Sequence, residues 1–546
     1  MNKHLFLSFC AVFVFSAHAQ NGINLPVTLF TNLQFPMEKI TVPVFPATSV
    51  SVNDFGAKGD GKTDNTQAFA KAIDAIVTQG GGTVEIPQGT WITGPIVLKS
   101  NVHIHTAKGT LVIFSTDKTL YPIVNANFEG LDTRRCQSPI SANNAQNIAI
   151  TGEGVFDGSG DAWRPVKKNK VSPAAWNALI LSGGVLDDKK STWWPSANAY
   201  NGSRLTTDQN VPDVKSEAEW QSIKDYLRPI MVDLVNCKNV WIGGITVQNS
   251  PAWTIHPFLC ENVIINNVTV RNPDYGQNTD GIDIESCKNV VLYQSSFSVG
   301  DDGICVKSGK NETGRKLGRP TENLIVDGCI VYHAHGGFVV GSEMSGGVRN
   351  VKVSNCMFKG TDAGLRFKST RGRGGVVENI DVENISMTDI GGDAVLFDLF
   401  YGNKDKETFV KADETTPAFR NITMKNISCN GAKRALYFNG LPEMNLENIS
   451  LENGRFTADQ GGAIRESSGV TLHNIRITTS ANPSLEIYNS QMVTLDNIIF
   501  PQTDKPIISV SGSACQYISI RNSPAITYSN ISWSKQATKD AVEVIP

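Results

Sequence analysis

A short pattern recurs along most of this chain and limits the folds open to it. Each copy is an Asn followed by alternating apolar residues, as in N-V-W-I-G-G-I-T-V from residue 239 and N-V-I-I-N-N-V-T-V from residue 262. Further copies begin at residues 289, 323, 350, 379 and 421. Steps of 23, 27, 34, 27, 29 and 42 residues separate these Asn residues. Periods of about 20–50 residues indicate a solenoid or a propeller.

The runs between turns are only three to five residues long and are joined by Asn and Gly, which favours an all-β fold. We predict a right-handed, single-stranded parallel β-helix. Asn tolerates the left-handed backbone of a tight turn, and its amide can hydrogen-bond to the coil above or below. Weaker copies at 470–477 and 493–500 extend the expected stack towards the C-terminus.

The N-terminal part has a different character. Residues 1–19 combine basic residues, an apolar run and a small-x-small site, which is typical of a secretory signal peptide. Residues 20–48 are expected to be an extended lead-in. An amphipathic helix is predicted over 66–77, where it would cap the open end of the stack. The catalytic β-helix domain would then span 49–546.

One segment, residues 158–228, interrupts the repeat. It contains five of the nine Trp residues, at positions 163, 176, 193, 194 and 220. Long loops in compact domains are usually functional, and Trp rings beside a cleft can stack on sugars. A self-packed surface insertion explains any single Trp equally well.

Charge and cysteine content restrict the partners. A formal net charge of −3 favours neither a nucleic acid nor an anionic membrane surface. After residue 19 no apolar run reaches the length of a membrane span. We therefore expect an exported, soluble monomer, either periplasmic or extracellular.

Nine Cys remain after the signal peptide, several at one repeat position, as in 236–240, 259–263 and 286–290. Buried thiols without obligatory disulfides are predicted, with no metal site and no cofactor.

Acidic residues gather in two turns about one coil apart. N-T-D-G at 278–281 and G-D-D-G at 300–303 flank a strand-like run. If one coil takes 21 or 22 residues, Asp280 lies beside Asp301 and Asp302. Like charges that close cannot all ionise independently, so one carboxyl holds its proton while another stays charged. Either turn alone is more simply explained as ordinary turn chemistry.

Other polar residues follow at coil spacing. His335 stands in A-H-G-G at 334–337, and Arg366 and Lys368 are two apart in L-R-F-K, hence on one face of a strand. Tyr401 follows in F-D-L-F-Y-G-N. Cations facing a group of acids predict a substrate held by its carboxylate.

Together these motifs resemble the polygalacturonases of glycoside hydrolase family 28. The similarity runs from D-F-G-A-K-G-D-G-K-T-D at 54–64 to at least Tyr401. It implies that Asp301 is the general acid and that Asp280 and Asp302 position and deprotonate the attacking water. It also implies that His335 supports the acid.

The resemblance gives binding roles as well. Arg366 and Lys368 match the residues that bind the galacturonate carboxylate, Tyr401 is a further match, and Asn278 is expected to contact substrate. The implied reaction is inverting hydrolysis of α-1,4-galacturonosyl linkages in an acidic polysaccharide. Ala334 and Phe367 depart from the usual family motifs without removing a functional group.

The loops predict where the polymer is cut. The segments 158–228, 309–320, 342–347 and 370–375 resemble those of the bacterial exo-acting branch, so we expect cleavage from a chain end. A rhamnogalacturonan or xylogalacturonan hydrolase of the same family stays open. A pectate lyase would need a Ca²⁺ site and a basic residue, and a non-catalytic sugar-binding β-helix would bind without hydrolysis.

Overall fold

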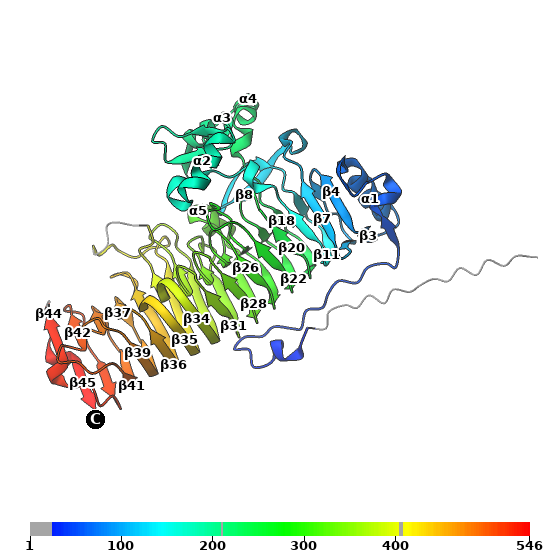
Figure 1. The fold of residues 1–546 in the computed structure, drawn as a ribbon. Coiled ribbons are helices and arrows are strands. Elements are labelled where there is room, and N and C mark those ends of the chain that lie inside the picture. The colour runs from blue at the N-terminus through cyan, green and yellow to red at the C-terminus, as the bar shows by residue number, and fades with distance from the viewer. Residues whose placement is uncertain (1–24, 209–210, 403–407, 535, 546) are drawn as a thin grey trace, which may run out of the picture.

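The computed structural model describes residues 25–208, 211–402, 408–534 and 536–545, so the expected signal peptide lies outside the described residues. The described chain winds into a long right-handed parallel β-helix, as predicted, with a few short helices at one end and one side (Figure 1). Among the described residues, no helix combines the length and apolar character that a membrane crossing requires.

Each coil contributes up to three strands, and strands of successive coils pair in parallel to form three strips. Strip 1 consists of β1 (Ser49–Ser51), β3 (Gly82–Ile86), β6 (Val102–Thr106), β11 (Gln146–Gly152), β19 (Lys238–Gly243), β22 (Glu261–Asn266), β25 (Lys288–Tyr293), β28 (Thr321–Asp327), β31 (Val348–Ser354), the first parts of β34 (Val376–Asp398), β35 (Ala418–Asn439), β36 (Leu446–Thr457) and β39 (Thr471–Thr478), and then β41 (Thr494–Ile499), β43 (Ile518–Arg521) and β45 (Val542–Ile545).

The other two strips complete each coil. Strip 2 consists of β2 (Asp60–Asp64), β4 (Gly89–Thr93), β7 (Thr110–Phe114), β12 (Val155–Asp157), β20 (Thr246–Gln248), β23 (Thr269–Arg271), β26 (Ser296–Ser298), β29 (Ile330–Tyr332), β32 (Met357–Lys359) and later parts of β34 and β35. Strip 3 consists of β5 (Ile96–Val97), β10 (Ile140–Asn143), β18 (Val232–Val235), β21 (Ile255–Phe258), β24 (Ile282–Glu285), β27 (Ile304–Lys307), β30 (Phe338–Val340), β33 (Leu365–Lys368), the ends of β34 and β35, β37 (Gln460–Arg465), β40 (Leu485–Tyr488), β42 (Ile508–Ser511) and β44 (Ile531–Ser534).

The recurring Asn forms a ladder along strip 1. Asn262 donates its side-chain amide to Asn239 at 3.1 Å, and Asn289 donates to Asn262 at 3.1 Å. The ladder continues through Asn323 at 3.0 Å and Asn350 at 3.1 Å. These residues have positive φ values, as a left-handed turn requires. The prediction that Asn amides join successive coils is confirmed, and the ladder fixes the register of the stack.

The core lies inside the coils. Aligned apolar residues such as Val263, Val290 and Leu324 are fully buried on successive rungs of strip 1. Burying one such side chain stabilises the fold by about 1.5–3 kcal/mol before entropy is counted. The nine cysteines of the described chain are all buried, as predicted, and each is a free thiol.

The N-terminal end is closed as the sequence indicated. Helix α1 (Thr66–Thr78) buries Phe69 and Ile73 against the first coils, close to the predicted bounds. The lead-in runs back along the outside of strip 1, where Leu29 and Ile40 pack against residues that include Ile264. This arm covers an apolar stripe that would otherwise face water.

The segment 158–228 forms an insertion with its own small core, including α2 (Pro173–Leu181), α3 (Ala197–Arg204) and α4 (Glu217–Ser222). Figure 1 shows it beside β8 (Ile123–Phe128) and α5 (Asn311–Leu317). Trp163, Trp176 and Trp193 are buried, with exposed fractions of 1%, 5% and 7%. These three rings therefore pack the insertion and cannot serve as sugar platforms.

Candidate active site

The winding of strip 3 brings the acidic turns together. Ile282 of β24 pairs with Ile304 of β27, so Asp280 lies beside Asp302 on the next coil. The backbone N–H of Gly281 donates to the carbonyl oxygen of Asp302 at 2.9 Å. A Cβ on Gly281 would lie 2.4 Å from the carbonyl oxygen of Gly303, so only glycine permits this close approach. The 22-residue offset is thus one coil, as the spacing predicted.

His335 lies beside Asp301 for the same reason. Ile304 pairs with Phe338, which places His335 next to Asp301 on the following coil. The backbone N–H of His335 donates to the carbonyl oxygen of Asp301 at 2.8 Å. Its Nδ1 lies 3.0 Å from Asp301 Oδ1. The hydrogen bond to Asp301 raises the pKa of His335 against the effect of burial. The imidazole and the carboxyl can therefore share one proton.

Arg366 and Lys368 project from the same face of β33 onto the acids. Arg366 Nη1 lies 3.2 Å from Asp302 Oδ1, and Lys368 Nζ lies 2.7 Å from Asp302 Oδ2. The ring of Tyr401 lies near both cations, 5.6 Å from the Arg366 guanidinium carbon and 5.0 Å from Lys368 Nζ. These contacts gather both cations and the Tyr on the side of Asp302 away from Asp280.

The acids differ in how readily they ionise. Burial, with Asp283 and Asp301 nearby, raises the pKa of Asp280 well above its usual range. Burial acts in the same direction on Asp302, but Lys368 and Arg366 outweigh it and hold the pKa of Asp302 below its usual range. The surroundings thus favour the protonated form of Asp280 and the charged form of Asp302. This is the division that the clustered acids predicted, and it falls between Asp280 and Asp302.

The side chain of Asn278 makes two hydrogen bonds within the protein. Its side-chain oxygen accepts a hydrogen bond from Arg228 Nη2 at 2.9 Å, and its amide donates to Glu129 at 3.4 Å. Both polar ends of the side chain are therefore engaged by the protein. Asn278 shapes the turn that leads to Asp280 and lines a cavity beside the insertion.

A buried charge network beneath the site was missed by the sequence analysis. Lys307 Nζ lies 3.1 Å from Glu343 and 3.6 Å from Asp283, and it sits 4.8 Å above the ring of Trp253. Burial raises the pKa of Asp283 to about 7, although Lys307 opposes this. The alternation in I-D-I-E and I-C-V-K was the available signal, because it puts these charges on the outer face of strip 3.

A second part of this network joins the preceding coils. His256 lies between Asp233 at 3.0 Å and Glu285 at 2.9 Å. Burial opposes charge on His256, but the two carboxylates outweigh it and raise its pKa to about 10. Strip 3 therefore has a paired, buried ionic layer below the catalytic turns, which holds their strands in one arrangement.

One group of donors has the proximity that a metal ion requires. Oxygen atoms of Asp280 and Asp302 and the sulfur of Cys305 lie within 4.8 Å of one another. Both oxygens of Asp302 already face cationic side chains, and Ca²⁺ takes 6–8 oxygen ligands. This donor set does not fit the calcium site that a pectate lyase would need.

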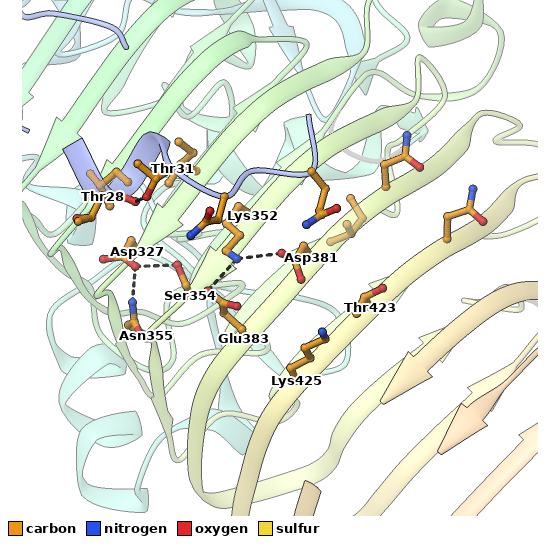
Figure 2. A pocket seen from close by; sticks show the side chains of 17 residues that line it. Thr28, Thr31, Asp327, Lys352, Ser354, Asn355, Asp381, Glu383, Thr423 and Lys425 are labelled. Carbon is orange, nitrogen blue, oxygen red and sulfur yellow. Dashed lines mark hydrogen bonds and ion pairs between the residues drawn. The ribbon is translucent and has the colours of Figure 1, made fainter. Parts of the chain in front are cut away.

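A larger cavity lies away from these acids, between the N-terminal arm and strip 1 (Figure 2). It measures about 790 Å³, and Figure 2 shows Lys352 bonded to Asp381 and Glu383 at its centre. Asp327 accepts hydrogen bonds from Ser354 and Asn355. Because these charges are already paired with one another, the cavity offers few free polar groups for catalysis, and we place the candidate active site on strip 3.

Comparison with known proteins identifies the family of this chain. The model of the family described as Glycosyl hydrolases family 28 matches residues 167–460, and the model described as Rhamnogalacturonase A/epimerase, pectate lyase-like matches residues 49–152. The crystal structure of a hyperthermoactive exopolygalacturonase from Thermotoga maritima is 33% identical, with a TM-score of 0.66, covering 80% of this chain and 93% of that one.

Two curated proteins are also similar. An exo-poly-alpha-D-galacturonosidase of Dickeya chrysanthemi is 27% identical over 387 residues, covering 69% of this chain and 62% of that protein. A probable polygalacturonase of Vitis vinifera is 26% identical over 416 residues, covering 74% of each chain. The family match over 167–460 includes every acid, the histidine and both cations of the site on strip 3.

Proposed function

This chain belongs to glycosyl hydrolases family 28 and is a glycoside hydrolase, and on that premise we propose that it hydrolyses α-1,4 linkages between galacturonate residues. The observation that supports this substrate most strongly is the pair of cations beside the acids of strip 3, the buried Lys368 and the partly exposed Arg366. Both cations keep Asp302 ionised, and a uronate carboxylate bound beside them would give them a second anionic partner.

Asp301 is the general acid in this proposal. Its Oδ1 bonds to His335 Nδ1, which leaves Oδ2 to protonate the oxygen of the departing sugar. About a quarter of the Asp301 side chain, 23%, is exposed, whereas Asp302 is 2% exposed. Asp301 is thus the member of the pair that a polymer lying on the surface can reach. His335 positions Asp301 and shares its proton.

Asp302 is the base that accepts a proton from the attacking water. It is the carboxyl kept ionised by Lys368 and Arg366. Asp280, with its raised pKa, orients the same water as a hydrogen-bonding partner. Water then attacks opposite the leaving group, and the configuration at the anomeric carbon inverts in a single displacement.

Arg366 and Lys368 also bind substrate in this proposal, and Tyr401 lies beside them. Arg366 has five N–H donors, and its contacts with Asp302 and the carbonyl oxygen of His335 both come from Nη1. Donors on Nη2 can bind the galacturonate carboxylate on the leaving side of the bond. The ring of Tyr401, which is 38% exposed, offers a face to the same sugar.

We propose exo action because of where the insertion lies. It leaves the β-helix between β12 and β18, two coils before β24. Gln277 and Asn278, next to the catalytic turn, and residues of the insertion line one cavity of about 400 Å³. A polymer lying along strip 3 would meet the insertion on the side of the earlier coils. The match to Rhamnogalacturonase A/epimerase covers only 49–152, before the catalytic residues, so it informs the fold and not the substrate.

The first product tests this function. Incubation with unesterified polygalacturonate should release one short saturated product from the earliest time points, detected by anion-exchange chromatography. A ladder of oligomers early in the digestion would reject exo action. Products that absorb in the ultraviolet would identify a lyase, and binding without new reducing ends would identify a non-catalytic protein.

Export and a monomeric state also belong to this proposal. Residues 1–19 support export by their signal-peptide pattern. The mature protein should begin at Gln20 when recovered from outside the cytoplasm, as N-terminal sequencing would show. A retained Met1 would contradict cleavage at this site.

A further inference from the structure

Three successive coils make their turns at the same place, directly after strip 3. Lys368, Asp398 and Asn439 are the last residues of β33, β34 and β35, and they pair in register. The turns that follow these strands therefore lie next to one another on neighbouring coils. Tyr401 stands in the middle turn, beside the cations of the candidate active site.

An ion pair joins the two outer turns across the middle one. Arg371 Nε donates to Glu443 Oε1 at 2.5 Å, and Arg371 Nη2 donates to Glu443 Oε2 at 2.8 Å. The exposed fractions of the two side chains are 16% and 1%, respectively. Burial opposes charge on Glu443, but the hydrogen bond from Arg371 outweighs it and lowers the pKa of Glu443. A bidentate pair of this kind fixes the relative orientation of its two partners.

The Arg371–Glu443 pair lies against Phe400 of the middle turn. The guanidinium carbon of Arg371 is 5.4 Å from the centre of the Phe400 ring, and Phe400 is buried. The backbone N–H of Phe400 donates to Asp398 Oδ1 at 3.0 Å, and that of Tyr401 donates to the carbonyl oxygen of Ser369 at 3.0 Å. Both the ring and the backbone of the middle turn are therefore held by neighbouring groups.

The turn that carries Glu443 is closed by its own hydrogen bonds. The backbone N–H of Leu441 donates to the carbonyl oxygen of Met444 at 3.0 Å, and the reverse bond measures 3.1 Å. Asn445 donates its side-chain amide to the carbonyl oxygen of Leu441 at 3.1 Å, and Leu441 is fully buried. Glu443 is thus presented to Arg371 from an anchored backbone.

The position of Phe400 decides where Tyr401 can lie. The two residues are consecutive, so holding the Phe400 ring under Arg371 also fixes the backbone from which the Tyr401 ring projects. That ring is partly exposed and lies 5.0 Å from Lys368 Nζ and 5.6 Å from the guanidinium carbon of Arg366. The chain of contacts therefore runs from Glu443 through Arg371 and Phe400 to Tyr401.

We propose that Arg371 and Glu443 are positioning residues for the galacturonate on the leaving side of the bond, and that they act through Tyr401. Their ion pair holds the face of the Tyr401 ring where it can stack on the sugar whose carboxylate Arg366 and Lys368 bind. This inference rests on the proposed hydrolysis of galacturonate linkages. It adds to that site two residues that act without touching the reacting atoms.

Two variants test the pair through the separate responses of KM and kcat. Glu443→Ala removes both acceptors, and Arg371→Met removes the guanidinium but keeps an unbranched chain over Phe400. Each should raise KM for trigalacturonate about fivefold, the size of a lost aromatic contact, and keep kcat within about twofold. The reason is that a displaced Tyr401 weakens binding of the ground state and of the transition state alike. If one variant does not fold, as judged by circular dichroism, the other decides.

A matched control removes an ion pair of the same kind elsewhere. Nε and Nη2 of Arg420 both lie 2.8 Å from Glu378 Oε2 on strip 1. Glu378→Ala should keep the KM and kcat of the wild type. Folded Glu443→Ala or Arg371→Met with the KM of this control would overturn the proposal. A fall in kcat at unchanged KM would also overturn it, because Tyr401 is proposed to act in binding.

A double variant shows whether the pair acts through Tyr401. Tyr401→Ala should raise KM about tenfold by itself, and Tyr401→Ala/Glu443→Ala should have the same KM as Tyr401→Ala. The second change has no effect there because the ring that the pair holds is already gone. Multiplied effects, which would raise KM about fiftyfold in the double variant, would show that the pair supports another part of the site and would overturn its role.

Failure of the function itself would look different. A wild-type protein that cleaves neither trigalacturonate nor polygalacturonate would reject the hydrolase on this substrate, and the positioning role with it. An active wild type whose KM is unchanged in Glu443→Ala and Arg371→Met would reject the positioning role alone.

Discussion

Asp301→Asn is expected to lower kcat on polygalacturonate by roughly 10³-fold, within the range of about 10²–10⁴ for loss of a general acid. The amide cannot protonate the departing sugar oxygen, yet it has the same shape and can still bond to His335. Because the side chain is partly exposed and, within the described ranges of the chain, is ion-paired only with His335, the melting temperature should change by only a few degrees. Initial rates of reducing-sugar release at saturating substrate measure the effect.

A matched control separates chemistry from folding. Asp459→Asn makes the same change on an exposed turn between β36 and β37, far along the chain from the site. It should keep wild-type turnover. Near-normal kcat in Asp301→Asn, with this control active, would remove Asp301 from the role of acid. A large rise in KM at unchanged kcat would likewise contradict it, since the acid acts in the transition state.

Lys368→Met is expected to lower kcat/KM by about 10²-fold and to move the acid limb of the pH profile to higher pH. Lys368 Nζ lies 2.7 Å from Asp302 Oδ2, and both groups are buried. In the wild type this ammonium is the strongest influence that lowers the pKa of Asp302, opposing burial. Without it the pKa of Asp302 rises, so the base is protonated over a wider acidic range. The profile of kcat/KM from pH 3 to pH 8 measures the shift.

The free energy of unfolding of Lys368→Met tests the ion pair between Lys368 and Asp302 independently of activity. Removing one partner of a buried salt bridge leaves the other charge uncompensated, which costs about 3–5 kcal/mol when no other partner remains. Arg366 still faces Asp302, so the loss should lie below that range. The double variant Lys368→Met/Asp302→Asn should recover stability but not activity. An unmoved acid limb in Lys368→Met would contradict the assignment of Asp302 as base.

The fold could be predicted because its determinants are local and repeated. One Asn at a left-handed turn on each coil fixes the register through bonds such as Asn262 to Asn239. Once the register is fixed, an offset of 22 residues places Asp280 beside Asp302, and the same winding places His335 beside Asp301. The proximity of the acids, the imidazole and the cations therefore follows from counting residues along the chain.

Other features depend on contacts between distant segments, so they could not be predicted by counting residues along the chain. Lys307 pairs with both Asp283 and Glu343, which are 60 positions apart in the sequence, and all three side chains are buried. Arg228 donates a hydrogen bond to Asn278 across 50 positions of sequence, a contact that no local pattern indicates. The Trp residues of 158–228 showed no periodicity that separates a self-packed core from a sugar platform, and three of them proved to be core.

The configuration of the first product tests the central claim most directly, because it reports on how the acids of strip 3 face one sugar. Proton NMR of a digestion of polygalacturonate in its first minutes, before the anomers equilibrate, distinguishes the two outcomes. Attack by water positioned by Asp280 and Asp302, opposite the oxygen protonated by Asp301, predicts that the new reducing end appears first as the β-anomer. An initial α-anomer, or no new reducing end at all, would contradict this arrangement of acid and base.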